Sequence, residues 1–197
     1  MSKIYPTGYR VPRFKVLLIS CIDLRLMDNI VRFMDHDNLT NRYDQFILAG
    51  TSIGAFVADG TDTDLEHIPA YSAWLTTLKQ HIDLAIQLHE IRDIYILEHR
   101  NCGAYKNFIK DNKGDFDADG VAVDAEFNSH LKYAVQLKDV ILKYVKESGE
   151  RVALSEVAGV KKHAAKYAEE FNVHSFLMDL KGNVELLDTT KKEPAAL

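Results

Sequence analysis

The stretch IYILEHRNCG, residues 94–103, predicts the central strand of the fold, and a histidine and a cysteine, His99 and Cys102, closely follow its apolar run. Residues 94–97 form the continuous apolar run of a strand that is covered on both faces, which is typical of parallel sheets. A second such run, VLLIS at residues 16–20, also ends at a cysteine, Cys21. Two further strands are predicted at residues 45–48 and 174–178.

Segments with helical periodicity separate these strands. Residues 69–89 place their apolar side chains on one stripe and begin with a proline, which suits a first helical turn. Residues 125–146 repeat this period, and Gly149 follows as a stop signal. Helices are also expected at residues 103–110 and at residues 155–171, where Ser155 is available as the cap.

The last apolar stretches, FLMDL and VELLD, are separated by KGN and predict a hairpin that turns at Gly182-Asn183. The sequence therefore predicts an α/β fold with a mainly parallel central sheet flanked by helices and a C-terminal hairpin. We expect one domain over residues 1–197, with an N-terminal arm at residues 1–12 and a frayed tail at residues 190–197.

Composition and charge exclude several classes of function. The chain has 197 residues, 47% of them hydrophobic, which is enough for a sizeable core. A net charge of −5 and a pI near 5.9 argue against a nucleic-acid partner. The apolar runs are too short to span a bilayer, and the first residues lack the apolar core of a signal peptide. We therefore expect a cytoplasmic protein with no membrane partner.

Cys21 and Cys102 are the only two cysteines of the chain. In a reducing compartment, two cysteines indicate metal binding or catalysis rather than a disulfide. Cys21 and His99 follow two predicted parallel strands, and Cys102 comes three residues after His99, so we expect the three side chains at one edge of the sheet. Two thiolates and one imidazole leave the fourth position of a tetrahedral Zn²⁺ ion open, as in catalytic sites. Two ordinary buried thiols are the alternative.

Asp23 and Arg25 follow Cys21 closely and are the predicted catalytic residues. A carboxylate beside the metal orients a bound hydroxide, and an arginine can hold that carboxylate in a bidentate pair. Without Arg25, Asp23 would be free to take the open position, since a carboxylate is a competent zinc ligand. We interpret the pair as the device that keeps the position open; a plain structural ion pair is the alternative.

The pattern Cys-x-Asp-x-Arg, followed much later by His-x-x-Cys-Gly, resembles the β-class carbonic anhydrases. Residues 43–51, 80–88 and 173–188 are also similar to segments of that family. The resemblance implies a zinc lyase in which the two cysteines and the histidine bind zinc. Its implied activity is the reversible hydration of carbon dioxide to bicarbonate by zinc-bound hydroxide. It also implies a homodimer or a dimer of dimers, with the small-molecule substrate as the other partner.

The chain departs from the family pattern around the site. The departures are Leu24 for Ser, Ile47-Leu48 for Arg-Asn, Thr51 for Asn and Glu98 for Gly. Strand alternation predicts that Glu98 points away from His99. Because such changes tune the bound water and the access of substrate, two alternatives stay open. One is a hydrolase of carbonyl sulfide or carbon disulfide, and the other is a non-catalytic zinc protein in which Asp23 stays on the metal.

Two further motifs give weaker indications of function. DFDADGVAVDAE, residues 115–126, matches the spacing of a calcium loop with ligands at Asp115, Asp117, Asp119 and Glu126. The preceding residues 112–114 should break any entering helix, so a solvated acidic loop is the preferred interpretation and a calcium site the alternative. Gly50-x-x-x-Gly54 is interpreted as a tight backbone turn beside the site.

Overall fold

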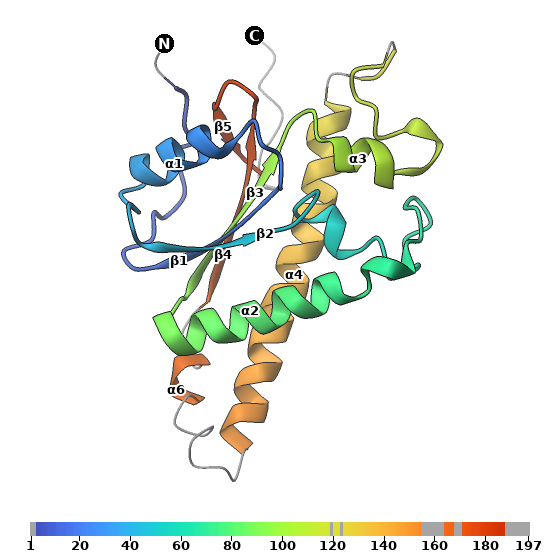
Figure 1. The fold of residues 1–197 in the computed structure, drawn as a ribbon. Coiled ribbons are helices and arrows are strands. Elements are labelled where there is room, and N and C mark those ends of the chain that lie inside the picture. Colours follow the sequence, from blue (N-terminus) through green and yellow to red (C-terminus); the bar gives the residue numbers. More distant parts are fainter. Residues whose placement is uncertain (1–2, 119, 123, 155–163, 168–170, 188–197) are drawn as a thin grey trace.

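The computed structural model describes residues 3–118, 120–122, 124–154, 164–167 and 171–187 (Figure 1). One sheet runs in the order β2-β1-β3-β4-β5. Its strands are β1 (Val16–Ser20), β2 (Tyr43–Ile47), β3 (Asp93–His99), β4 (Asn172–Met178) and β5 (Val184–Leu186). The first four strands are parallel, whereas β5 is antiparallel to β4. The predicted mainly parallel sheet with a C-terminal hairpin is confirmed.

Helices cover both faces of the sheet, and Figure 1 shows α1 on one side and α2 and α4 on the other. The longer helices are α1 (Met27–His36), α2 (Ala73–His89) and α4 (Ala125–Leu154). The shorter ones are α3 (Gly103–Phe108), α6 (Ala164–Tyr167) and the 3₁₀ turns η1 (Ile53–Ala55), η2 (Pro69–Tyr71) and η3 (Lys110–Asn112). No helix within the described ranges combines the length and the apolar character that crossing a membrane requires.

Strand β3 runs through the middle of the fold and divides the core in two. Ile94 and Ile96 pack in the larger cluster, which includes side chains of α2 and α4, whereas Tyr95 and Leu97 pack in the cluster beneath α1. Successive side chains of a strand point to opposite faces. The same alternation continues to the end of β3 and separates the side chains of Glu98 and His99.

Helix α4 is longer than predicted, because Gly149 does not end it. A Cβ atom at this position would lie 2.8 Å from the Cβ of Tyr167 on α6. Glycine inside a helix costs roughly 1 kcal/mol relative to alanine, and here it allows α6 to approach α4 closely. The stop signal in the sequence is therefore a packing signal in the structure.

The other helix predictions differ from the structure at their ends. The helix predicted at residues 69–89 begins as the 3₁₀ turn η2, and α2 proper starts at Ala73. The short helix after Cys102 ends at Phe108 instead of residue 110. Of the helix predicted at residues 155–171, the structure describes a helical segment at Ala164–Tyr167. Ser155 and the tail at residues 190–197 lie outside the described residues.

Helix α1 was not predicted from the sequence. Its segment MDNIVRFMDH is polar on average, and its N-cap, Leu26, makes no side-chain cap hydrogen bond. Only Ile30, Phe33 and Met34 are buried, at the i, i+3, i+4 spacing of one helical face. Packing of this narrow stripe on the sheet, rather than a terminal signal, accounts for the helix.

Candidate metal centre

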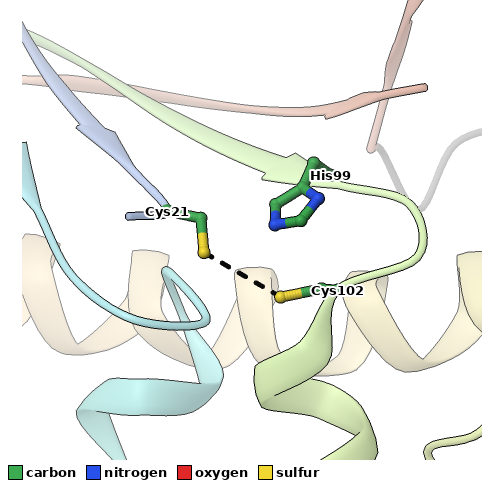
Figure 2. A group of neighbouring side chains, drawn as sticks. All are labelled: Cys21, His99 and Cys102. Carbon is green, nitrogen blue, oxygen red and sulfur yellow. Dashed lines mark hydrogen bonds between the residues drawn. The ribbon is translucent and has the colours of Figure 1, made fainter. Parts of the chain in front are cut away.

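The sheet topology brings Cys21, His99 and Cys102 together (Figure 2). Cys21 follows β1 directly, and His99 is the last residue of β3 rather than the residue after it. The two strands are parallel neighbours, with Ser20 opposite Leu97. Cys102 begins α3 as its N-cap. All three side chains are buried, and their ligand atoms lie within 4.8 Å of one another.

The arrangement of these atoms fits a zinc ion. The two Sγ atoms are 3.9 Å apart; two thiolates on one tetrahedral zinc ion lie about 3.8 Å apart, given Zn–S bonds of about 2.3 Å. The Nδ1 of His99 is 2.9 Å from the backbone oxygen of Arg100, to which it donates as Nδ1–H. This tautomer leaves the lone pair on Nε2, which is buried without a hydrogen-bond partner among the described residues. The donor set therefore suits Zn²⁺.

The sulfur of Cys21 accepts a hydrogen bond from the backbone N–H of Gly50, 3.3 Å away. The Cys102 sulfur and this N–H lower the pKa of Cys21, whereas the neighbouring Cys21 sulfur raises the pKa of Cys102. Adjacent thiolates repel each other, and a cation between them removes the repulsion. Gly50 has φ +76°, and a Cβ there would lie 2.6 Å from the Ile53 side chain. The tight turn predicted at this glycine is confirmed.

Asp23 and Arg25 form a bidentate pair beside the three side chains. Arg25 donates from Nε to Oδ1 of Asp23 at 2.9 Å and from Nη2 to Oδ2 at 2.6 Å. These hydrogen bonds from Arg25 lower the pKa of Asp23 to about 2, so the carboxyl group is ionised at neutral pH. Its Oδ2 lies 3.9 Å from Nε2 of His99. The carboxylate is therefore close to the candidate metal position while it stays bound to Arg25.

Arg25 has a second partner, Asn101, which the sequence analysis missed. Nη1 of Arg25 donates to Oδ1 of Asn101 at 3.1 Å, and Nη2 of Arg25 donates to the Asn101 backbone oxygen at 3.0 Å. Asn101 has φ +56°, a left-handed conformation that asparagine tolerates better than most residues. In the sequence, the one indication of this contact was the presence of an asparagine between His99 and Cys102.

The acidic residues at 115–126 are paired with neighbouring groups. Asp115 contacts Nζ of Lys106 at 2.6 Å, and Asp117 accepts a hydrogen bond from the side-chain amide of Asn101. Glu126 accepts from the backbone N–H of Asn101 and from Arg100. Asp117 is exposed, in keeping with the preferred interpretation of a solvated acidic loop, and all three carboxylates also have partners in the protein. Asp119 lies outside the described residues.

Glu98 lies on the face opposite His99, as strand alternation predicted. It is fully buried, its Oε1 accepts the backbone N–H of Ser52 at 2.9 Å, and its Oε2 is 3.0 Å from Nδ1 of His130 on α4. The His130 ring packs on Tyr105, with ring centroids 3.9 Å apart. Glu98 therefore ties the Gly50 turn to α4 from behind the candidate centre.

The remaining departures from the family pattern differ in their exposure. Leu24 is 91% exposed and Ile47 is 42% exposed, whereas Leu48 and Thr51 are buried. Thr51 donates from Oγ1 to the backbone oxygen of Leu97 at 3.4 Å, which joins the turn to β3. Leu24 therefore has little packing within this chain, although it separates Asp23 from Arg25.

Solved structures of carbonic anhydrases are similar to this chain. An enzyme from Streptococcus mutans is 16% identical, with 92% of this chain and 87% of that chain covered and a TM-score of 0.40. A β-carbonic anhydrase of Aspergillus fumigatus is 14% identical, with coverage of 91% and 78% and a TM-score of 0.42. One from Trichomonas vaginalis is 13% identical, with coverage of 92% and 87% and a TM-score of 0.41.

Two curated sequence relatives match about half of this chain. An uncharacterized protein of Rickettsia conorii is 37% identical over 93 residues, which cover 47% of this chain and 44% of the relative. One from Rickettsia bellii is 35% identical over 97 residues, which cover 49% and 52%. The chain therefore spans about half the length of the curated relatives it matches. No family model matches.

Proposed function

We propose that this chain is a β-carbonic-anhydrase-like zinc enzyme that catalyses the reversible hydration of carbon dioxide to bicarbonate. One observation carries the proposal: a buried Cys-His-Cys group with its ligand atoms within 4.8 Å of one another has an ionised carboxylate, Asp23, held beside it by Arg25. Three protein ligands suit a catalytic zinc ion, which keeps its fourth position for the reaction.

Each of these residues has a role in the proposed reaction. Cys21, His99 and Cys102 would hold Zn²⁺, which as a Lewis acid would make hydroxide available near neutral pH. The Asp23 carboxylate accepts a hydrogen bond from the hydroxyl group that adds to carbon dioxide, and it thereby directs a lone pair at the carbon atom. Arg25 keeps Asp23 in this position and prevents it from becoming a fourth ligand.

The proposal extends to the cellular setting and the assembly of the protein. We infer a cytoplasmic protein whose partner, besides carbon dioxide and bicarbonate, is a second copy of the chain, as a homodimer or a dimer of dimers. The same site would also suit carbonyl sulfide or carbon disulfide as substrate. A non-catalytic zinc protein is the third possibility, because Oδ2 of Asp23 lies only 3.9 Å from Nε2 of His99.

Stopped-flow hydration of carbon dioxide tests the proposal on protein whose zinc content has been measured. From about pH 7 to about pH 9, the range in which zinc-bound water ionises, the rate should rise and should scale with zinc content. Asp23→Asn should retain zinc and lose most of the rate. Asp28→Asn is the matched control, because it removes an exposed charge on α1, five positions further along the chain.

Three outcomes separate the alternatives. Hydration that rises with pH and follows zinc content supports the proposed enzyme. Fully zinc-loaded protein that hydrolyses carbonyl sulfide or carbon disulfide but does not hydrate carbon dioxide favours the second substrate class. Fully loaded protein that is inactive on all three substrates overturns the enzymatic proposal and leaves a zinc-binding protein.

A further inference from the structure

The Arg25 side chain is held by hydrogen bonds to Asn101 as well as to Asp23. The Arg25 side chain is 42% exposed, and an exposed ion pair by itself restrains a long side chain only weakly. Four hydrogen bonds nevertheless hold the guanidinium group, two to Asp23 and two to Asn101. The orientation of Arg25 therefore depends on whether Asn101 is itself fixed.

Asp117 fixes the side-chain amide of Asn101. The amide nitrogen Nδ2 donates to a carboxylate oxygen of Asp117, so the amide oxygen Oδ1 must face Arg25. If the amide rotated by a half turn, its NH₂ group would meet the guanidinium group and two donors would face each other. Asp117 thus determines that Asn101 offers Arg25 an acceptor.

Glu126 fixes the backbone of Asn101. Its Oε1 accepts the Asn101 N–H at 2.5 Å, which supports the left-handed conformation of that residue. Its Oε2 accepts from Arg100 at 2.9 Å, and Arg100 also donates to Glu185 on β5 at 2.7 Å. Helix α4 and the C-terminal hairpin are thereby tied to the loop that carries Asn101.

We propose that Asp117 and Glu126, together the acidic clamp, are positioning residues that act through Asn101 to hold Arg25 on Asp23. Under this proposal, two residues of the segment 115–126, whose spacing resembles a calcium loop, position Arg25 beside the candidate metal centre and bind no ion themselves. Among the described residues, the hydrogen bonds of Asp117 and Glu126 reach Asp23 through Asn101 and Arg25. Glu126 also holds Arg100, whose backbone oxygen accepts from His99. The inference rests on the proposed function for its consequence in catalysis, but the clamp itself is a property of the protein structure.

Proton NMR of zinc-loaded, ¹⁵N-labelled protein tests the clamp without reference to activity. The Arg25 Nε–H signal, assigned by its loss in Arg25→Lys, should exchange with water slowly in the wild type. In Asp117→Ala and in Glu126→Ala we expect faster exchange, on the order of ten- to hundredfold, because hydrogen bonds to charged groups are lost. Asp115→Ala is the matched control, since Asp115 belongs to the same segment but contacts Lys106; its exchange should stay within about twofold of the wild type.

A second measurement follows the effect to the metal. In cobalt-substituted protein, Asp117→Ala and Arg25→Ala should shift the visible absorption bands in the same direction, toward a site with Asp23 as a ligand, whereas Asp115→Ala should match the wild type. Unchanged Nε–H exchange in both clamp variants overturns the proposal. A wild type with slow Nε–H exchange but no hydration activity leaves the clamp standing and refutes the proposed function, so the two failures are distinguishable.

Discussion

Replacing His130 with leucine should destabilise the protein strongly, although His130 is not a predicted metal ligand. His130 and Glu98 are both fully buried, and their side chains are 3.0 Å apart. The leucine would remove the imidazole partner of the Glu98 carboxyl group, which would keep its hydrogen bond from the Ser52 N–H at 2.9 Å. Removing one member of a buried pair costs about 3–5 kcal/mol. Because leucine refills most of the volume of the ring, we expect a loss of about 4 kcal/mol.

Urea unfolding of the zinc-loaded protein, followed by circular dichroism, measures this loss. In thermal unfolding of a chain of this size, a loss of about 1 kcal/mol lowers the Tm by roughly 2–4 °C, so the Tm of the variant should fall by roughly 8–16 °C. The double variant Glu98→Leu/His130→Leu is the control. It removes both polar groups of the pair and leaves the Ser52 N–H without its carboxylate acceptor, at a cost of about 1–3 kcal/mol. The double variant should therefore be more stable than His130→Leu. A single variant within about 1 kcal/mol of the wild type, or a double variant less stable than the single one, would refute this reasoning.

Three further predictions concern the site and the hairpin. Arg25→Ala should retain zinc but lose at least about tenfold in hydration rate, because one lost charged hydrogen bond is worth that much and Asp23 becomes free to bind the metal; full activity with full zinc would contradict this role. Cys102→Ser should lose zinc in equilibrium dialysis and should unfold at a lower temperature, since metal binding is coupled to folding; undiminished zinc content would argue against Cys102 as a ligand. Burial raises the pKa of Asp179, but hydrogen bonds from Asn183 outweigh burial and hold that pKa below its usual value. The resulting stabilisation is present above the ordinary carboxyl pKa of about 4 and is lost as the pH falls below it. The difference in unfolding free energy between wild type and Asp179→Asn should thus narrow from about pH 6 to about pH 3, and a constant difference would rule out this linkage.

Sequence patterns predicted the parts of the structure that depend on local periodicity. The apolar runs before Cys21 and His99 predicted two central strands, and strand ends of a parallel sheet meet at one edge. The proximity of Cys21, His99 and Cys102 followed from those two facts. Gly149 was misinterpreted because a glycine that ends a helix and a glycine that admits a neighbouring side chain have the same local signature.

Contacts between distant polar residues could not be predicted in this way. Arg25 and Asn101 are 76 positions apart, and nothing in the spacing of either motif pairs them. The pairing of Glu98 with His130 likewise depends on how α4 crosses the sheet. Such contacts are set by tertiary packing and have no periodic pattern, which is why the surroundings of the site emerge only from the structure.

The separation of the two cysteines along the chain has a consequence for the unfolded state. Their sulfurs are 3.9 Å apart but belong to residues 81 positions apart. An ion held by both sulfurs would cross-link the chain and close a loop of that length. For a covalent cross-link, the loss of chain entropy over such a loop corresponds to about 4.5 kcal/mol at 25 °C. The stability of the folded chain would then depend on the supply of the metal as well as on the sequence.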